Sequence, residues 1–187
     1  MKQRGQVVID KILDTAEHLF YTQGYSNTGI NQIIDEADIA KASLYKHFET
    51  KTDLLVAYVQ RTHERWFSRL ENSVTKVEDP QKKLLAIFDY HIERQEIRQF
   101  GGCPFIKVND EAGTDDPRVL AQIRLMKQHS KEFIKGLVAD SGHKKELTDE
   151  ELTETIYTML EGAIVTASVF KSASPIQSAK HIIQKLI

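Results

Sequence analysis

Apolar residues recur at helical spacing along most of the chain. In the first segment they fall on one face of a helix that is expected over about residues 6–23, with Gly24 as the residue that ends it: Val8, Ile12, Ala16, Leu19 and Phe20. Ile30, Ile33 and Ile34 predict a short second helix, which Thr28 would cap. Leu44 and Phe48 predict a third short helix, and residues 35–38 form the turn between the two.

The later helices are marked by their capping residues. Thr50 is expected to cap a long fourth helix, with Asp53 at its third position. Asp79-Pro80 and Asp116-Pro117 pair a capping Asp with Pro at the first helical position. Thr148 and Ser174 each begin a capping-box pattern. The remaining helices are expected at about 80–98, 103–112, 117–140, 148–171 and 175–187.

No stretch alternates as a strand does, so the pattern predicts an all-α fold of nine helices. A functional boundary is expected inside the fourth helix, giving domains at 1–53 and 54–187. With 41% hydrophobic and 28% charged residues among 187, the composition is ordinary for a globular protein. No run approaches the ~18 apolar residues of a membrane span, and no signal peptide is evident. One cysteine fits a reducing compartment, so a cytoplasmic protein is expected.

Residues 24–51 carry the clearest functional signal. Two short helices joined by a tight turn are the shape of a helix-turn-helix, whose second helix reads the DNA major groove. With Leu44 and Phe48 inward, the polar side chains of that helix face outward, and Ala42 permits close approach of the backbone. These outward residues are Lys41, Ser43, Tyr45, Lys46 and His47. They can contact phosphates or base edges, so the segment predicts a transcription regulator.

Net charge does not add to this prediction. The chain carries −2, and residues 1–53 hold six Lys/Arg against eight Asp/Glu. Phosphate contact is a short-range, screened effect, so the placement of charges matters more than their sum. Lys41, Lys46 and Lys51 cluster on and just after the third helix.

The first 55 residues resemble the TetR family of bacterial transcriptional regulators. The resemblance lies in residues 16–20 (AEHLF), Gly24-Tyr25, 28–30 (TGI), Ile33, Ala37, 41–48 (KASLYKHF), Lys51 and Leu54-Leu55. It implies that the outward residues of the third helix contact double-stranded operator DNA and that Lys51 holds a phosphate. Thr28, at a helix N-terminus, can present backbone N–H groups and a hydroxyl to phosphate, and it can also be a plain cap. Gly29 and Asn31 are further expected DNA-contacting residues. Asp38 stands where the family turn usually has Gly, although Asp tolerates the left-handed conformation. The resemblance also implies a C-terminal domain that binds a small-molecule effector and forms a homodimer.

The residue pattern of the last two helices favours dimerisation independently. Helices 148–171 and 175–187 carry broad apolar stripes, and Gly162, Ala163, Ala167 and Ser168 would allow another helix to approach closely. The alternative is that both helices only complete their own chain's core. A two-fold dimer predicts a near-palindromic operator. Repression with release by an effector is expected, although activation remains open.

The segment around Cys103 suggests a sensor. Gly101 and Gly102 interrupt the fifth helix and Pro104 begins the sixth, so Cys103 is expected at a helix N-terminus, where the dipole favours thiolate. Lys107 could add positive charge. The thiol would then sense oxidants or electrophiles. The alternative is a small residue buried at a tight helix start.

Polar groups available to an effector pocket are His91, Arg94, Asn109 and Glu111. The seven His show no metal-ligand spacing, and no phosphate loop or nucleophile elbow is present. The sequence therefore predicts no enzyme, no catalytic residue, no metal and no cofactor. The alternative function is a helical ligand-binding or thiol-reactive protein that does not bind DNA.

Overall fold

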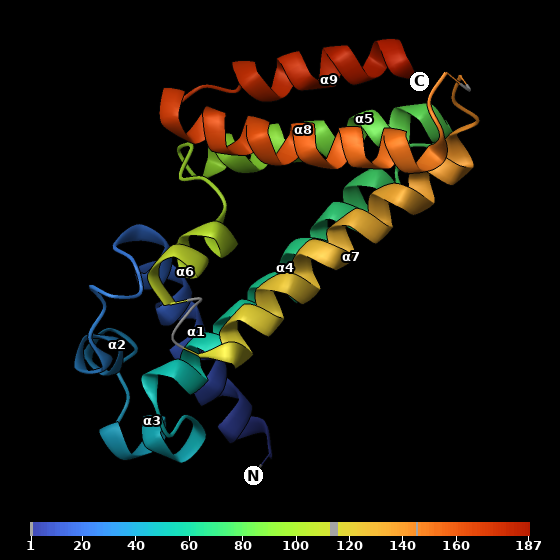
Figure 1. Cartoon of the computed structure of the whole chain (residues 1–187). Coiled ribbons are helices and arrows are strands. Elements are labelled where there is room, and N and C mark those ends of the chain that lie inside the picture. Colours follow the sequence, from blue (N-terminus) through green and yellow to red (C-terminus); the bar gives the residue numbers. More distant parts are fainter. Residues whose placement is uncertain (1, 113–115, 145) are drawn as a thin grey trace. The chain divides into compact units, whose positions relative to one another are not determined.

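The computed structural model describes residues 2–112, 116–144 and 146–187, with side chains from residue 5 onward. Nine helices and no strands are present in these ranges, which confirms the all-α fold (Figure 1). The helices are α1 (Lys2–Thr22), α2 (Ile30–Glu36), α3 (Lys41–His47), α4 (Lys51–Val74), α5 (Pro80–Ile97), α6 (Pro104–Ala112), α7 (Pro117–Ser141), α8 (Asp149–Phe170) and α9 (Ser174–Leu186).

The chain forms two compact units. The first contains residues 1–64 and 104–124, and the second contains residues 65–103 and 125–187. Helices α4 and α7 each contribute to both units. The functional division at residue 53 stays a prediction. The compact first unit extends beyond it and also includes α6 and the beginning of α7.

The second unit has an extensive apolar core where α5, α8 and α9 pack together. In Figure 1 these helices are the green, orange and red ribbons that run beside one another. Phe88 of α5, Ile156 of α8 and Ile176 of α9 are each fully buried. Burying side chains of this size contributes about 1.5–3 kcal/mol each, so this core stabilises the second unit strongly.

Most capping predictions are confirmed. The Asp79 carboxylate accepts a hydrogen bond from the Lys82 backbone at the start of α5, and Thr148 and Glu151 form a reciprocal capping box on α8. Ser174 was expected to cap the last helix, and this is wrong. Ala173 occupies the N-cap position without a side-chain bond, so Ser174 is already helical.

No helix in the described part of the chain is both long enough and apolar enough to cross a membrane.

Candidate nucleic-acid interface

Helices α2 and α3 are held by a shared apolar core and a tight turn. Ile33 and Leu44 are fully buried, and both short helices pack on α1. Asp38 lies in the turn with φ 48°, the left-handed conformation expected at the position where Gly is usual in the resemblance. The departure to Asp therefore leaves the helix-turn-helix intact.

The outer face of α3 carries the predicted DNA-contacting side chains. Lys41, Ala42, Tyr45 and Lys46 are exposed, whereas Ser43 and His47 are partly exposed. The Lys41 ammonium lies 5.9 Å from the centre of the Tyr45 ring. Buried Leu44 and Phe48 fix the opposite face. This surface presents hydrogen-bond donors and an aromatic ring, which are the groups used for phosphate and base contacts.

Thr28 is placed differently from the prediction. Gly29, not Thr28, is the N-cap of α2, and the Thr28 side chain makes no capping bond. Its hydroxyl donates to the Gly24 carbonyl at 2.6 Å and accepts from the Gln23 amide at 3.1 Å, and the residue is 1% exposed. The hydroxyl therefore fixes the turn before α2 and is buried from phosphate. Gly29 and Asn31 are exposed at the beginning of α2.

Lys51 begins α4 and lies against the same turn. Its ammonium donates to the Tyr25 carbonyl at 2.6 Å and lies 4.0 Å from the centre of the Tyr25 ring. Burial lowers the pKa of Lys51, and the Glu111 carboxylate acts in the opposite direction. The contact with phosphate predicted for Lys51 remains a prediction. In this structure its cation is engaged within the protein.

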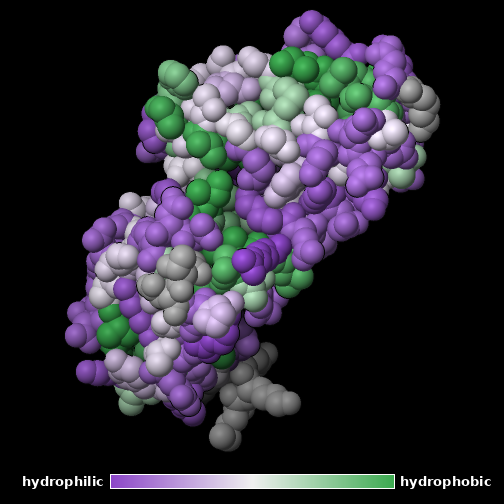
Figure 2. All heavy atoms as spheres, viewed as in Figure 1, coloured by the Kyte–Doolittle hydropathy of each residue, from purple (hydrophilic) through white to green (hydrophobic). Residues whose placement is uncertain are grey.

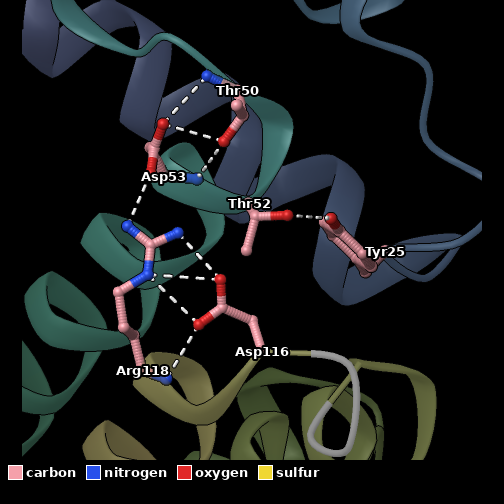
Figure 3. Close-up of polar contacts among 6 residues, drawn as sticks. All are labelled: Tyr25, Thr50, Thr52, Asp53, Asp116 and Arg118. Carbon is pink, nitrogen blue, oxygen red and sulfur yellow. Dashed lines mark hydrogen bonds and ion pairs between the residues drawn. The ribbon is translucent and has the colours of Figure 1, made fainter.

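The first turn of α4 is joined to the beginning of α7, as Figure 3 shows. Thr50 and Asp53 exchange hydrogen bonds in the predicted cap, and the Arg118 guanidinium pairs with Asp53 at 2.8 Å and with Asp116. The hydrogen bonds from Thr50 and Arg118 lower the pKa of Asp53. Sequence reasoning missed Arg118, because its partner Asp53 lies 65 residues away.

Two residues expected at the effector site, Lys107 and Glu111, contact the end of α1 and the turn after it. Lys107 donates to the Tyr21 carbonyl at 3.0 Å, and Glu111 accepts from the Ser26 backbone N–H at 2.7 Å. Asn109, on the same helix, is exposed. These α6 residues belong to the first unit, whereas His91, Arg94 and Cys103 belong to the second. The structure thus does not bring the six predicted effector residues together in one unit.

Cys103 has a different cationic neighbour from the one predicted. Lys127 of α7 lies 4.0 Å from the Cys103 sulfur and 2.5 Å from the Glu161 carboxylate of α8. Burial acts to lower the pKa of Lys127, but the nearby Cys103 and Glu161 outweigh it and the pKa is raised. The positive charge assigned to Lys107 is therefore supplied by Lys127. Lys127 and Cys103 come together only in the folded chain, because 24 positions separate them in the sequence.

A glutamine holds the segment before Cys103. Both ends of the Gln95 amide bond Gly102, whose N–H donates to Oε1 at 3.1 Å and whose carbonyl accepts from Nε2 at 3.4 Å. Gln99 and Phe100 adopt left-handed φ values of 51° and 54°. Gly102 also has positive φ, and a Cβ there would lie 3.3 Å from Ser168. This tight chain path fixes where the thiol lies.

His91 is buried among aromatic rings of the second unit. Its ring centre lies 5.7 Å from that of Trp66 and 5.5 Å from that of Tyr90, whose hydroxyl donates to the Trp66 carbonyl. Burial, assisted by the charge of Lys127, lowers the pKa of His91 to about 3. A neutral imidazole can both donate and accept a hydrogen bond. Arg94, one turn further along α5, is partly exposed.

Within the described residues, no group of three or more His, Cys, Asp or Glu is arranged to hold a metal ion. The helix-turn-helix, with its exposed basic and aromatic α3 face joined to a helical second unit, defines a DNA-binding transcriptional regulator. Residues 12–58 match the model of bacterial regulatory proteins of the tetR family, and residues 80–183 match the tetracyclin repressor-like C-terminal domain. The chain belongs to the tetR family, whose members are transcriptional regulators rather than enzymes.

Relatives of this chain include a negative regulator and an activator of transcription. The chain is 25% identical over 178 residues to the biofilm operon icaADBC negative transcriptional regulator IcaR of Staphylococcus aureus, covering 91% of this chain and 90% of IcaR. It is 28% identical over 142 residues to the transcriptional activator FasR of Mycolicibacterium smegmatis, covering 75% of this chain and 61% of FasR. The matches to a regulator in the lacX 3' region of Lactococcus lactis and to the regulator MT1294 of Mycobacterium tuberculosis span 50% and 42% of those proteins.

A solved TetR regulator from Chloroflexus aurantiacus has the same fold. The TM-score is 0.83 at 24% identity, covering 97% of this chain and 94% of that one.

Proposed function

We propose that this protein is a homodimeric repressor that binds a near-palindromic operator and leaves it when a small-molecule or electrophilic effector binds. The observation that carries DNA recognition is the α3 face. Its exposed Lys41, Tyr45 and Lys46 are backed by buried Leu44 and Phe48. A rigid helix with donors on one face is what sequence-specific reading of a major groove requires.

The surface of α8 and α9 supports the dimer. Val165, Val169 and Phe170 of α8 are 45%, 71% and 71% exposed, and Ile182 of α9 is 47% exposed. Figure 2 shows hydrophobic atoms at the surface over these helices. Gly162 lies on α8 with open space beyond its Cα, which allows a partner helix to approach closely. A second copy of this helix pair would cover the apolar residues in a four-helix interface.

Two features of the second unit support an effector site. The cluster around neutral His91 offers aromatic walls with one polar group. Cys103, beside the Lys127 ammonium, offers a thiol whose thiolate form is favoured by a neighbouring cation. The repressor role is supported by IcaR, the negative regulator, although FasR shows that relatives include an activator.

Selection of bound sequences from random duplex DNA tests this proposal. The recovered sequences are expected to contain two related half-sites in inverted repeat, separated by one helical turn or more. Fluorescence anisotropy with the selected duplex then compares the parent with a Lys41→Gln/Lys46→Gln variant. The matched control is Lys76→Gln/Lys135→Gln, which removes two exposed lysines outside α3. If no motif is enriched, or if the α3 variant binds the duplex as tightly as the parent, the proposal fails. The alternative, a ligand-binding or thiol-reactive protein that does not bind DNA, would then stand.

A further inference from the structure

Helix α6 carries two oppositely charged side chains, one helical turn apart, that both reach the end of α1 and the turn after it. The Lys107 ammonium donates to the Tyr21 carbonyl at 3.0 Å and lies 4.5 Å from the centre of the Tyr21 ring. Tyr21 is in the last turn of α1, where carbonyls lack helical partners and a cation is favourable. Lys107 therefore caps the C-terminal end of α1.

Glu111 makes the complementary contact. Its carboxylate accepts from the Ser26 backbone N–H at 2.7 Å. Gly24, with φ 90°, passes so close that a Cβ there would lie 2.7 Å from the same carboxylate. The Lys107 ammonium thus donates to a carbonyl, and the Glu111 carboxylate accepts from an N–H. Both are charge-assisted hydrogen bonds, which are stronger than hydrogen bonds between neutral groups. We call Lys107 and Glu111, with these contacts, the α6 clamp.

The turn held by the clamp connects to α2 and to the beginning of α4. Its Tyr25 carbonyl accepts from Lys51 at the beginning of α4. The Thr28 hydroxyl bonds back to the Gly24 carbonyl, and Gly29 then begins α2. Glu111 also acts on Lys51 directly, because its charge raises the pKa that burial lowers. Displacement of the turn would therefore displace both the N-terminus of α2 and Lys51.

We infer that Lys107 and Glu111 are positioning residues for operator binding. They hold the turn of residues 24–28 where α2 and Lys51 can meet the DNA backbone while α3 reads the bases. This inference rests on the proposed function. It assigns α6 a role in setting DNA affinity, distinct from lining an effector pocket.

The test compares Glu111→Ala and Glu111→Gln with Asp110→Asn. Asp110 is the exposed neighbour on the same helix, so its variant makes the same charge change as Glu111→Gln without touching the turn. Lys107→Met is compared with Lys135→Met, which removes an exposed lysine of α7. Anisotropy gives the dissociation constants for the selected operator and for a scrambled duplex. Both are measured well below each thermal midpoint and normalised to active protein by stoichiometric titration. Amide exchange at Ser26 monitors the contact itself.

Glu111→Ala and Lys107→Met are expected to weaken operator binding by about tenfold per half-site, the effect of losing one hydrogen bond to a charged group, and so by about a hundredfold for the dimer. Affinity for the scrambled duplex is expected to fall less than affinity for the operator. Non-specific binding is not confined to the one register in which α2 and Lys51 meet the backbone while α3 reads the bases, and the α3 lysines remain. Faster exchange at Ser26 is expected to accompany the loss in Glu111→Ala. Glu111→Gln is expected to recover part of it, since the amide oxygen can still accept from Ser26.

Failure of this inference differs from failure of the proposed function. A parent protein that selects no operator would overturn the proposed function. Operator binding by Glu111→Ala and Lys107→Met equal to that of the parent would overturn only the inference. Equal losses on operator and scrambled duplexes would also overturn it, because the effect would then not depend on the register that base reading fixes.

Discussion

The buried imidazole of His91 makes the free energy of unfolding depend on pH in a way that one substitution should remove. Burial lowers the pKa of His91 to about 3 in the folded protein, against 6.5 for an ordinary histidine. Between these values the unfolded chain takes up a proton that the folded chain excludes. Above about pH 6.5 the imidazole is neutral in both states and does not lower the free energy of unfolding. As the pH falls from 6.5 toward 3, the free energy of unfolding decreases progressively.

The size of the effect follows from the two pKa values. Linkage gives a loss of about 2 kcal/mol in the free energy of unfolding between about pH 8 and about pH 5 from this one group. Other groups also titrate over this range, so the quantity to compare is the difference between the parent and a variant without the imidazole. His91→Phe keeps an aromatic ring beside Trp66 and Tyr90 and removes the ionisable group.

Urea unfolding followed by circular dichroism at both pH values, at one protein concentration, gives this difference. His91→Phe is expected to lose about 2 kcal/mol less than the parent on acidification. His181→Gln, which removes an exposed histidine of α9, is expected to follow the parent. The same pH dependence in His91→Phe and the parent would refute the reasoning, because the imidazole would then not be held neutral by its surroundings.

Two further predictions concern the second unit. Lys127→Met is expected to slow alkylation of Cys103 by N-ethylmaleimide several-fold at neutral pH, because the thiolate loses the cation 4.0 Å away. Mass spectrometry of the quenched reaction gives the rate. A rate unchanged from the parent would exclude activation of the Cys103 thiol by Lys127. Val165→Glu, which places a charge on the exposed apolar face of α8, is expected to give monomers in sedimentation velocity. Gln128→Glu, which adds the same charge to the exposed side of α7, is expected to stay dimeric. A dimeric Val165→Glu variant would contradict the proposed interface.

The sequence predicted those features of the fold that depend on neighbouring residues. Gly24 ends α1 with positive φ, and Thr148 with Glu151 caps α8, because these signals act within one helical turn. The predictions that Thr28 and Ser174 cap helices are wrong, because a local pattern does not fix the exact residue at which a helix begins. Both fit the local pattern, but each helix begins one position away from its expected start, and Thr28 uses its hydroxyl within the preceding turn.

Contacts between distant segments could not be predicted from one sequence. Lys107 fits an i, i+4 relation to Cys103, yet it bonds the Tyr21 carbonyl, and Lys127 occupies the place beside the thiol. Glu111 is likewise expected as a polar group of an effector pocket, yet it accepts a hydrogen bond from Ser26. Helical periodicity indicates which face of a helix is apolar. It does not identify which other helix the polar side chains of that helix will meet.

The salt dependence of operator binding tests the central claim most directly. Each phosphate contact contributes about −0.9 to the slope of log affinity against log salt concentration. If the α3 face of each protomer of a dimer meets the DNA backbone, replacing Lys46 by Gln removes one cation from each half-site. The slope is then expected to become shallower by about 1.8, whereas Lys135→Gln leaves it unchanged. A parent slope near zero, or a Lys46→Gln slope identical to that of the parent, would contradict the assignment of α3 as the DNA-reading helix.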